Sequence, residues 1–145
     1  MSIVDNFIGT WKLVTTEFHR SDGTIIDPYG RDALGILTYD KAGNMAAQLM
    51  RSDRPTFGVG DMYEGTPEEI KAAFEGLITY FGRYDVNAET KIVTHHITGC
   101  SFPNWMGADQ TRLFAFSDDR LTLSTPPILL GGSTLTGILV WERVA

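Results

Sequence analysis

The best candidates for chemistry in this 145-residue sequence are two polar residues that share strand faces with apolar neighbours. His95 alternates with Val93 and Ile97, whereas the adjacent His96 alternates with threonines. Successive side chains of a strand point to opposite faces, so His95 is the histidine that we expect to face the interior. Imidazole titrates near neutrality and suits a general acid, a general base or a hydrogen-bonding anchor for a ligand oxygen. The alternative is a structural histidine bonded to a buried carbonyl or tyrosine.

Arg112 is the second candidate, because it shares its strand face with Phe114 and Phe116. A guanidinium among aromatic side chains must find an acceptor or water. A ligand carboxylate, phenolate or enolate would serve. The alternative is an internal salt bridge to one of three acidic residues, Glu17, Asp109 or Glu142.

We expect His95 and Arg112 to act together, since consecutive strands of a meander usually pair. In a binding protein, Arg112 would pair with an anionic or carbonyl oxygen while His95 donates a hydrogen bond. In an enzyme without a cofactor, Arg112 would stabilise a developing enolate while His95 moves a proton. Both alternatives require one shared cavity.

Large apolar and aromatic side chains are expected to form the wall and rim of that cavity. The ligand-binding candidates are Tyr39, Met50, Phe57, Tyr63, Tyr84, Phe102, Trp105 and Phe114. Tyr39, Tyr80 and Tyr84 could donate to a ligand carbonyl, and Trp105 lies in a loop, where rim contact is its functional interpretation. The alternative for any one aromatic is ordinary core packing.

The elements that position these residues are mostly strands, indicated by alternating apolar and polar side chains. In the first strand, Trp11, Leu13 and Thr15 are expected on one face and Phe18 on the other. Turn residues separate about eight expected strands, at 9–19, 35–39, 45–51, 83–86, 91–98, 110–116, 120–125 and 134–143. An eight-stranded meander that curls on itself removes its exposed edges by closing into an antiparallel up-and-down β-barrel. A β-sandwich is the competing all-β fold.

One helical insertion is predicted after a long loop. Thr66 and Glu69 form a capping box and Pro67 suits the first helical position, so the helix should begin there and end near Thr79 or Tyr80. Its apolar residues recur at three- and four-residue spacing, so one face should pack on the barrel or cover its mouth. The glycine-rich stretch 52–65 is expected to act as a lid beside it.

The composition fits a single soluble domain of 145 residues with a net charge of −6. Scattered basic residues and an acidic balance argue against nucleic acid and anionic membranes as partners. We expect neither export nor membrane spanning. The single cysteine, Cys100, cannot form an intrachain disulfide and favours a cytoplasmic setting. The sequence has no zinc motif and no phosphate-cradling loop, so we expect no metal and no cofactor.

Several segments together resemble a known family. The sequence Gly9-Thr10-Trp11 is similar to the GxW signature of lipocalin and calycin barrels, and Arg143 resembles the basic residue that packs across that tryptophan. More specific segments lie at 27–30, 35–39, 47–51, 95–107, 109–112 and 121–126. They resemble the short bacterial and fungal proteins of a lipocalin-like domain family over nearly the whole chain. The resemblance implies a barrel that binds apolar or amphipathic small molecules, and some relatives look like isomerases or cyclases.

These observations leave three functions in competition. The first is binding of a small hydrophobic or aromatic organic molecule in the barrel. The second is a cofactor-independent isomerase, cyclase or lyase that acts on a carbonyl compound through His95 and Arg112. The third is a structural or interaction role through the long loop and the helix. The oligomeric state stays open, with a homodimer as one alternative.

Overall fold

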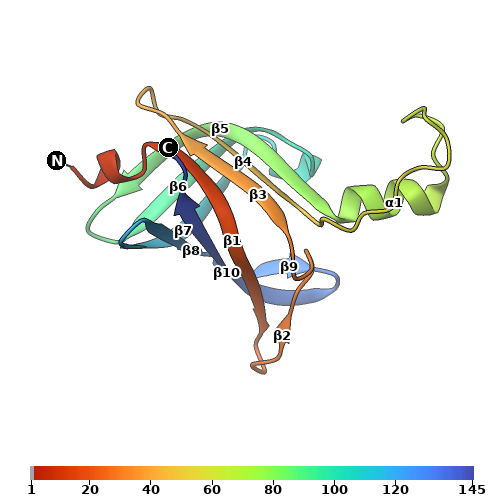
Figure 1. Cartoon of the computed structure of the whole chain (residues 1–145). Helices are drawn as coiled ribbons and strands as arrows, with labels where there is room; N and C mark the ends of the chain where they lie inside the picture. Colours follow the sequence, from red (N-terminus) through yellow and green to blue (C-terminus); the bar gives the residue numbers. More distant parts are fainter. Residues whose placement is uncertain (1) are drawn as a thin grey trace.

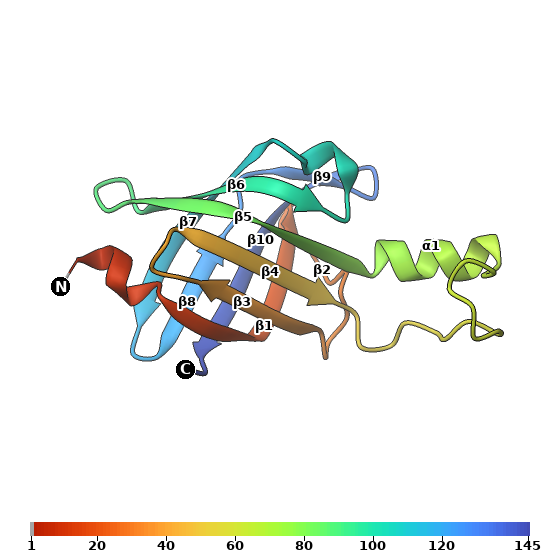
Figure 2. The ribbon, with the colours of Figure 1, turned by 90° about the horizontal axis from the view of Figure 1, so that it is seen from above.

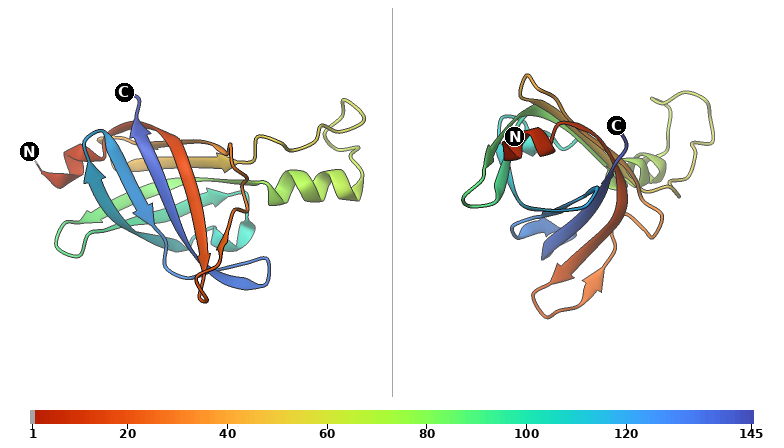
Figure 3. Two further views of the ribbon diagram at one scale, coloured as in Figure 1. Left: turned by 60° about the horizontal axis from the view of Figure 1, so that its bottom comes forward. Right: turned by 60° about the vertical axis from the view of Figure 1, so that its left-hand side comes forward.

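A computed structural model describes residues 2–145 and contains a closed antiparallel barrel of eight strands. The barrel strands are β1 (Gly9–Arg20), β3 (Leu34–Tyr39), β4 (Asn44–Met50), β5 (Leu77–Asn87), β6 (Ile92–Cys100), β7 (Asp109–Ser117), β8 (Arg120–Ser124) and β10 (Ser133–Arg143). Each pairs with the next, and β10 pairs with β1, so each of these eight strands has a neighbour on both sides and the barrel is closed. Figure 3 shows this ring of strands nearly end-on. The predicted all-β, lipocalin-like barrel is confirmed.

Two short strands extend the rim of the barrel. β2 (Ile25–Ile26) pairs with the end of β1, and β9 (Ile128–Leu130) pairs with the start of β10. Both lie beside the same end of the barrel (Figure 1). β9 has no counterpart among the predicted strands, because three residues are too few to show an alternation.

The opposite end is closed around Trp11. Trp11 pairs with Arg143 across β1 and β10, and the guanidinium carbon lies 4.3 Å from the centre of the indole ring. The indole N–H donates to the carbonyl of Phe7 at 2.9 Å, just after the 3₁₀ helix η1 (Ile3–Asn6). Arg143 also donates to the carbonyl of Ile8 at 2.8 Å. The predicted stacking of Arg143 on buried Trp11 is therefore confirmed.

The first strand contains a β-bulge, which corrects one prediction about its faces. The register between β1 and β10 shifts between Leu13 and Thr15. As a result, Trp11, Leu13 and Phe18 are all buried in the core, although strict alternation places Phe18 on the outer face. An extra residue in one strand reverses the alternation beyond it.

The helix α1 (Pro67–Glu75) begins where predicted but ends earlier. Thr66 accepts from the Glu69 amide at 3.2 Å, and the Glu69 carboxylate accepts from the Thr66 amide at 2.8 Å, which completes the capping box. Gly76 follows the helix, and the next residues pair with β4, from Leu77 opposite Met50 onwards. The predicted helix end near Thr79 or Tyr80 is wrong, because pairing with a neighbouring strand outweighs the local helical pattern.

The helix and the loop before it form an arm that points away from the barrel (Figures 1 and 2). No residue of α1 is buried, and the side chains of Ile70 and Phe74 are each 48% exposed. The apolar face of the helix as a whole therefore does not pack on the barrel, and the alternative expectation, that this face covers the mouth, holds only for Phe74 in the last turn, which lines the cavity. Only the last turn of α1 lies near the barrel, where the helix joins β5.

Candidate functional site

The barrel encloses a cavity of about 510 Å³. Its wall consists mostly of strand residues, namely Phe18, Leu37, Ala47, Leu49, Leu77, Ile78, Tyr80, His95, Arg112, Leu123, Leu139 and Trp141, together with Thr125 just after β8. Its remaining lining comes from loops, the end of α1 and β9, namely Pro28, Tyr29, Phe74, Glu75, Phe102, Trp105, Ile128, Leu129, Leu130 and Gly131. The lining is thus mostly aliphatic and aromatic, with a few polar groups, as in pockets for small organic molecules.

His95 is buried between two tyrosines, with only 1% of its surface exposed. Its Nε2 lies 2.7 Å from the Tyr39 hydroxyl and its Nδ1 lies 2.9 Å from the Tyr80 hydroxyl. Burial, together with the positive charge of nearby Arg112, lowers the pKa of His95 to about 3. The imidazole is therefore neutral near pH 7, and one ring nitrogen donates to a tyrosine while the other accepts from a tyrosine. The predicted inward orientation of His95 is confirmed.

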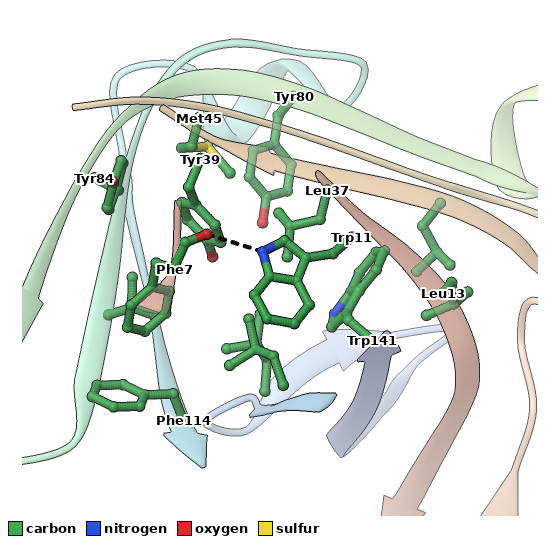
Figure 4. Close-up of a cluster of buried hydrophobic side chains, with 14 of the residues drawn as sticks. Phe7, Trp11, Leu13, Leu37, Tyr39, Met45, Tyr80, Tyr84, Phe114 and Trp141 are labelled. Atoms are coloured by element: carbon green, nitrogen blue, oxygen red, sulfur yellow. Dashed lines mark hydrogen bonds between the residues drawn. The ribbon is translucent and has the colours of Figure 1, made fainter. Parts of the chain in front are cut away.

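The two tyrosines differ in what they face. Tyr80 lines the cavity, whereas Tyr39 is buried in the core and does not line it. Figure 4 shows both side chains within the cluster of buried residues. Burial raises the pKa of Tyr39 well above its ordinary value, and burial also raises the pKa of Tyr80 although the charge of Arg112 opposes that rise. Both hydroxyls therefore stay protonated at neutral pH, and Tyr80 brings the hydrogen-bonded chain to the surface of the cavity.

Arg112 lies on the cavity wall and is 7% exposed. It stands opposite Val93 in the pairing of β6 with β7, two residues along from His95, so both side chains point into the same cavity as the strand-face argument predicts. Its Nη1 donates to the carbonyl of Thr111 at 2.8 Å.

The expected alternative of an internal salt bridge to Arg112 is not formed within residues 2–145. Two of the three acidic candidates lie beside histidines instead: Glu17 is 3.0 Å from His19, and Asp109 is 2.8 Å from His96. The guanidinium therefore faces an apolar cavity without a carboxylate from the described chain.

His96 occupies the outer face, as the alternation predicts. Its ring bridges Asp85 at 2.6 Å and Asp109 at 2.8 Å, and these hydrogen bonds raise the pKa of His96 above its ordinary value. The two adjacent histidines thus have opposite environments and do not share a site.

Two of the eight predicted ligand contacts line the cavity. Phe102 and Trp105 flank its rim around the 3₁₀ helix η2 (Pro103–Trp105), with ring centres 6.0 Å apart. Trp105 also meets the edge of Tyr80, with ring centres 6.1 Å apart. These side chains form an aromatic patch at the rim.

Three other predicted contacts are buried in the core closer to Trp11. Tyr39 bonds His95, Tyr84 donates to the carbonyl of Asp40 at 2.8 Å, and Phe114 packs edge-on against Phe7 with centres 4.9 Å apart. They support the floor of the cavity and do not line it.

The last three predicted contacts, Met50, Phe57 and Tyr63, lie outside the cavity lining. The Met50 sulfur is 3.4 Å from Nη2 of Arg54, Phe57 packs beside Gly65, and Tyr63 is 87% exposed. No residue of the loop 52–65 lines the cavity, so the expectation that this loop forms a lid is wrong.

Trp141 is the most informative lining residue that the sequence interpretation missed. Its indole Nε1 is buried and has no hydrogen-bond partner among residues 2–145. Trp141 alternates with Leu139 and Gly137 on the inner face of β10, and that alternation is the signal that could have identified it.

Two further properties follow from the described residues. No group of three His, Cys, Asp or Glu side chains between residues 2 and 145 is arranged to hold a metal ion. Within the same residues, no helix has the length and apolarity needed to cross a membrane.

Comparison with known proteins places this barrel in a family. The chain is 32% identical over 107 residues to the 4'-hydroxy-3'-methoxypropiophenone carrier protein ppsC of Aspergillus oryzae, an alignment that covers 69% of this chain and 96% of that protein. Residues 8–144 match the family model described as a lipocalin-like domain. The chain therefore belongs to the lipocalin-like domain family.

Proposed function

We propose that this barrel binds and carries a small, largely apolar aromatic molecule that bears an acceptor oxygen. The observation that carries this proposal is Arg112, a buried cation on the wall of an apolar cavity with no carboxylate partner in the described chain. A buried charge without a partner is costly, and a ligand oxygen would supply the missing acceptor.

The size and lining of the cavity suit such a ligand. Its volume of about 510 Å³ lies within the range of typical small-molecule pockets, roughly 300–1,000 Å³. Trp105, Tyr80 and Trp141 provide aromatic surface, against which a ligand ring can stack or meet an edge. The cavity therefore offers a place for one substituted aromatic ring.

The polar groups of the cavity wall specify an acceptor. The guanidinium of Arg112, the one lining group that is charged in the interior of the described barrel, can only donate hydrogen bonds. The relative from Aspergillus oryzae is named for a propiophenone with a hydroxyl and a methoxy group, which is an aromatic ketone rich in acceptor oxygens. Its name supports the same ligand class for this chain.

The environment of His95 favours binding over catalysis by proton transfer. Both ring nitrogens are engaged by tyrosine hydroxyls, and the pKa of about 3 makes the imidazole a poor base near neutral pH. We therefore assign His95 the role of fixing Tyr80 at the cavity surface.

The proposal is tested by calorimetric titration of 4'-hydroxy-3'-methoxypropiophenone into the wild type and two matched variants. Ala47 lines the cavity on β4, whereas Ala46 points to the outer face of the same strand. We expect one molecule to bind per chain, Ala47→Phe to abolish binding by filling the cavity, and Ala46→Phe to keep it. Chromatography should recover the ligand unchanged. Equal binding by Ala47→Phe, or no binding by the wild type, would contradict the proposal.

A further inference from the structure

The charges of the residues that line the cavity determine whether a ligand is bound in its neutral or its ionised state. Five residues that line the cavity can carry a charge: Tyr29, Glu75, Tyr80, His95 and Arg112. Burial raises the pKa of Tyr29 to about 12 and also raises that of Tyr80, while the pKa of His95 is lowered to about 3. These three groups are neutral between about pH 5 and pH 9.

Glu75 does not balance the charge of Arg112. It is exposed at the end of α1 where the cavity opens, and the described structure shows no ion pair between it and Arg112. The interior therefore holds one positive charge, with Nη1 bonded only to the neutral carbonyl of Thr111.

A neutral ligand oxygen would satisfy hydrogen bonds of the guanidinium but would leave its charge buried and uncompensated. An ionised oxygen compensates the charge and makes a shorter, stronger charge-assisted hydrogen bond. The attraction is greatest in a low-dielectric cavity from which the ligand displaces water.

We propose that the cavity takes a phenolic aromatic ligand as its phenolate, with the ionised oxygen held by Arg112. This inference rests on the proposed function and adds the ionisation state of the ligand. On binding, the phenol O–H bond breaks, its electron pair stays on the oxygen and the proton leaves to the solvent. His95 does not keep that proton, because both of its ring nitrogens are already bonded to tyrosines.

Proton release makes the affinity depend on pH in a defined way. At pH values below the pKa of the free phenol, each molecule bound releases one proton, so the dissociation constant should fall about tenfold for each unit of rising pH. At pH values above that pKa, the phenol is already ionised in solution and the dependence should disappear.

The experiment compares 4'-hydroxy-3'-methoxypropiophenone with its methyl ether, 3',4'-dimethoxypropiophenone, which cannot ionise. Calorimetry in buffers of different ionisation enthalpy counts the protons released, and the phenolate absorption band reports the bound form. For the phenol we expect one proton released and a phenolate spectrum at a pH where the free phenol is neutral. For the ether we expect weaker binding that does not change with pH.

Two variants separate the role of Arg112 from a general charge effect. Arg112→Met should remove the proton release and weaken binding of the phenol, whereas Arg120→Met, which removes the same charge from the exposed start of β8, should change neither. If the wild type binds phenol and ether equally and without proton release, the phenolate inference is overturned while the proposed function stands. If neither compound binds, both fail.

Discussion

Replacing His95 by leucine should destabilise the protein strongly, because it leaves two buried tyrosine hydroxyls without a partner. In the native chain these hydroxyls bond the imidazole at 2.7 and 2.9 Å. Leucine is close to histidine in size and leaves little change in packed volume. The loss should therefore come from the unpaired hydroxyls of Tyr39 and Tyr80.

The magnitude follows from where each hydroxyl lies. A buried polar group without a partner costs about 1–3 kcal/mol. Tyr39 is 2% exposed and does not line the cavity, so it carries this cost in full. Tyr80 faces the cavity, where water can replace the imidazole, so its share is smaller. We expect His95→Leu to lower the free energy of unfolding by about 2–5 kcal/mol.

A triple variant provides the control. Adding Tyr39→Phe and Tyr80→Phe to His95→Leu removes both unpaired hydroxyls and should recover most of the lost stability, since replacing all partners by apolar groups is nearly neutral. Urea unfolding at pH 7.5, followed by circular dichroism, measures both differences. If the single and triple variants are equally unstable, the loss comes from packing and the hydrogen-bond reasoning is refuted.

Two other predictions concern the free energy of unfolding, first at acidic pH and then in a variant of the closed end of the barrel. Below pH 6.5 the unfolded chain protonates His95 while the folded chain keeps it neutral down to about pH 3, so the free energy of unfolding should fall by about 1.4 kcal/mol per pH unit as pH decreases. Urea unfolding of the wild type and of His95→Gln between pH 6.5 and 5 tests this, because the part of the slope that comes from His95 should be missing in the variant; the contribution of His96, whose pKa is raised in the folded chain, has the opposite sign and is common to both proteins. Arg143→Met removes the stacking on Trp11 and the bond to Ile8, and should cost about 1–3 kcal/mol in the same assay at pH 7.5; an unchanged midpoint would contradict this.

The barrel was predictable because most of its strands obey a period of two and the turns between them have clear signals. The hairpin at Asp40 to Asn44 follows from that pattern, whereas the contact of Arg143 with Trp11 was implied by the resemblance to lipocalin and calycin barrels. The bulge after Leu13 was not predictable, because nothing in the local residue types marks the extra residue. The end of α1 was missed since Leu77 fits both a helical spacing and a strand, and only its pairing with β4 decides between them.

The residues of the site that lie on regular strands could be predicted, because strand alternation shows which side chains face the interior. His95 and Arg112 could be oriented from their neighbours, and both line the cavity. Phe57 and Tyr63 could not be placed, because the position of a long loop depends on tertiary contacts that leave no periodic signal. Met50 lies on β4 next to the cavity-lining Leu49, so strand alternation itself turns Met50 away from the cavity. The alternative of a structural histidine bonded to a buried tyrosine is what the structure shows for His95, but Tyr39 and Tyr80 could not be identified as the partners, since they are distant from His95 in the sequence.

The central claim, that an aromatic ligand binds inside the barrel, can be tested at the three tryptophan indoles, which give separate N–H signals in nitrogen-correlated NMR spectra. The indole ring of Trp141 lines the cavity, and its buried N–H has no partner among residues 2–145. Trp105 lies at the rim, and the N–H of Trp11 is already bonded to the carbonyl of Phe7 in the core. On titration with 4'-hydroxy-3'-methoxypropiophenone, we expect the largest shift at Trp141, a smaller one at Trp105 and the least at Trp11. A saturating ligand that leaves the Trp141 signal unmoved would contradict binding in the cavity.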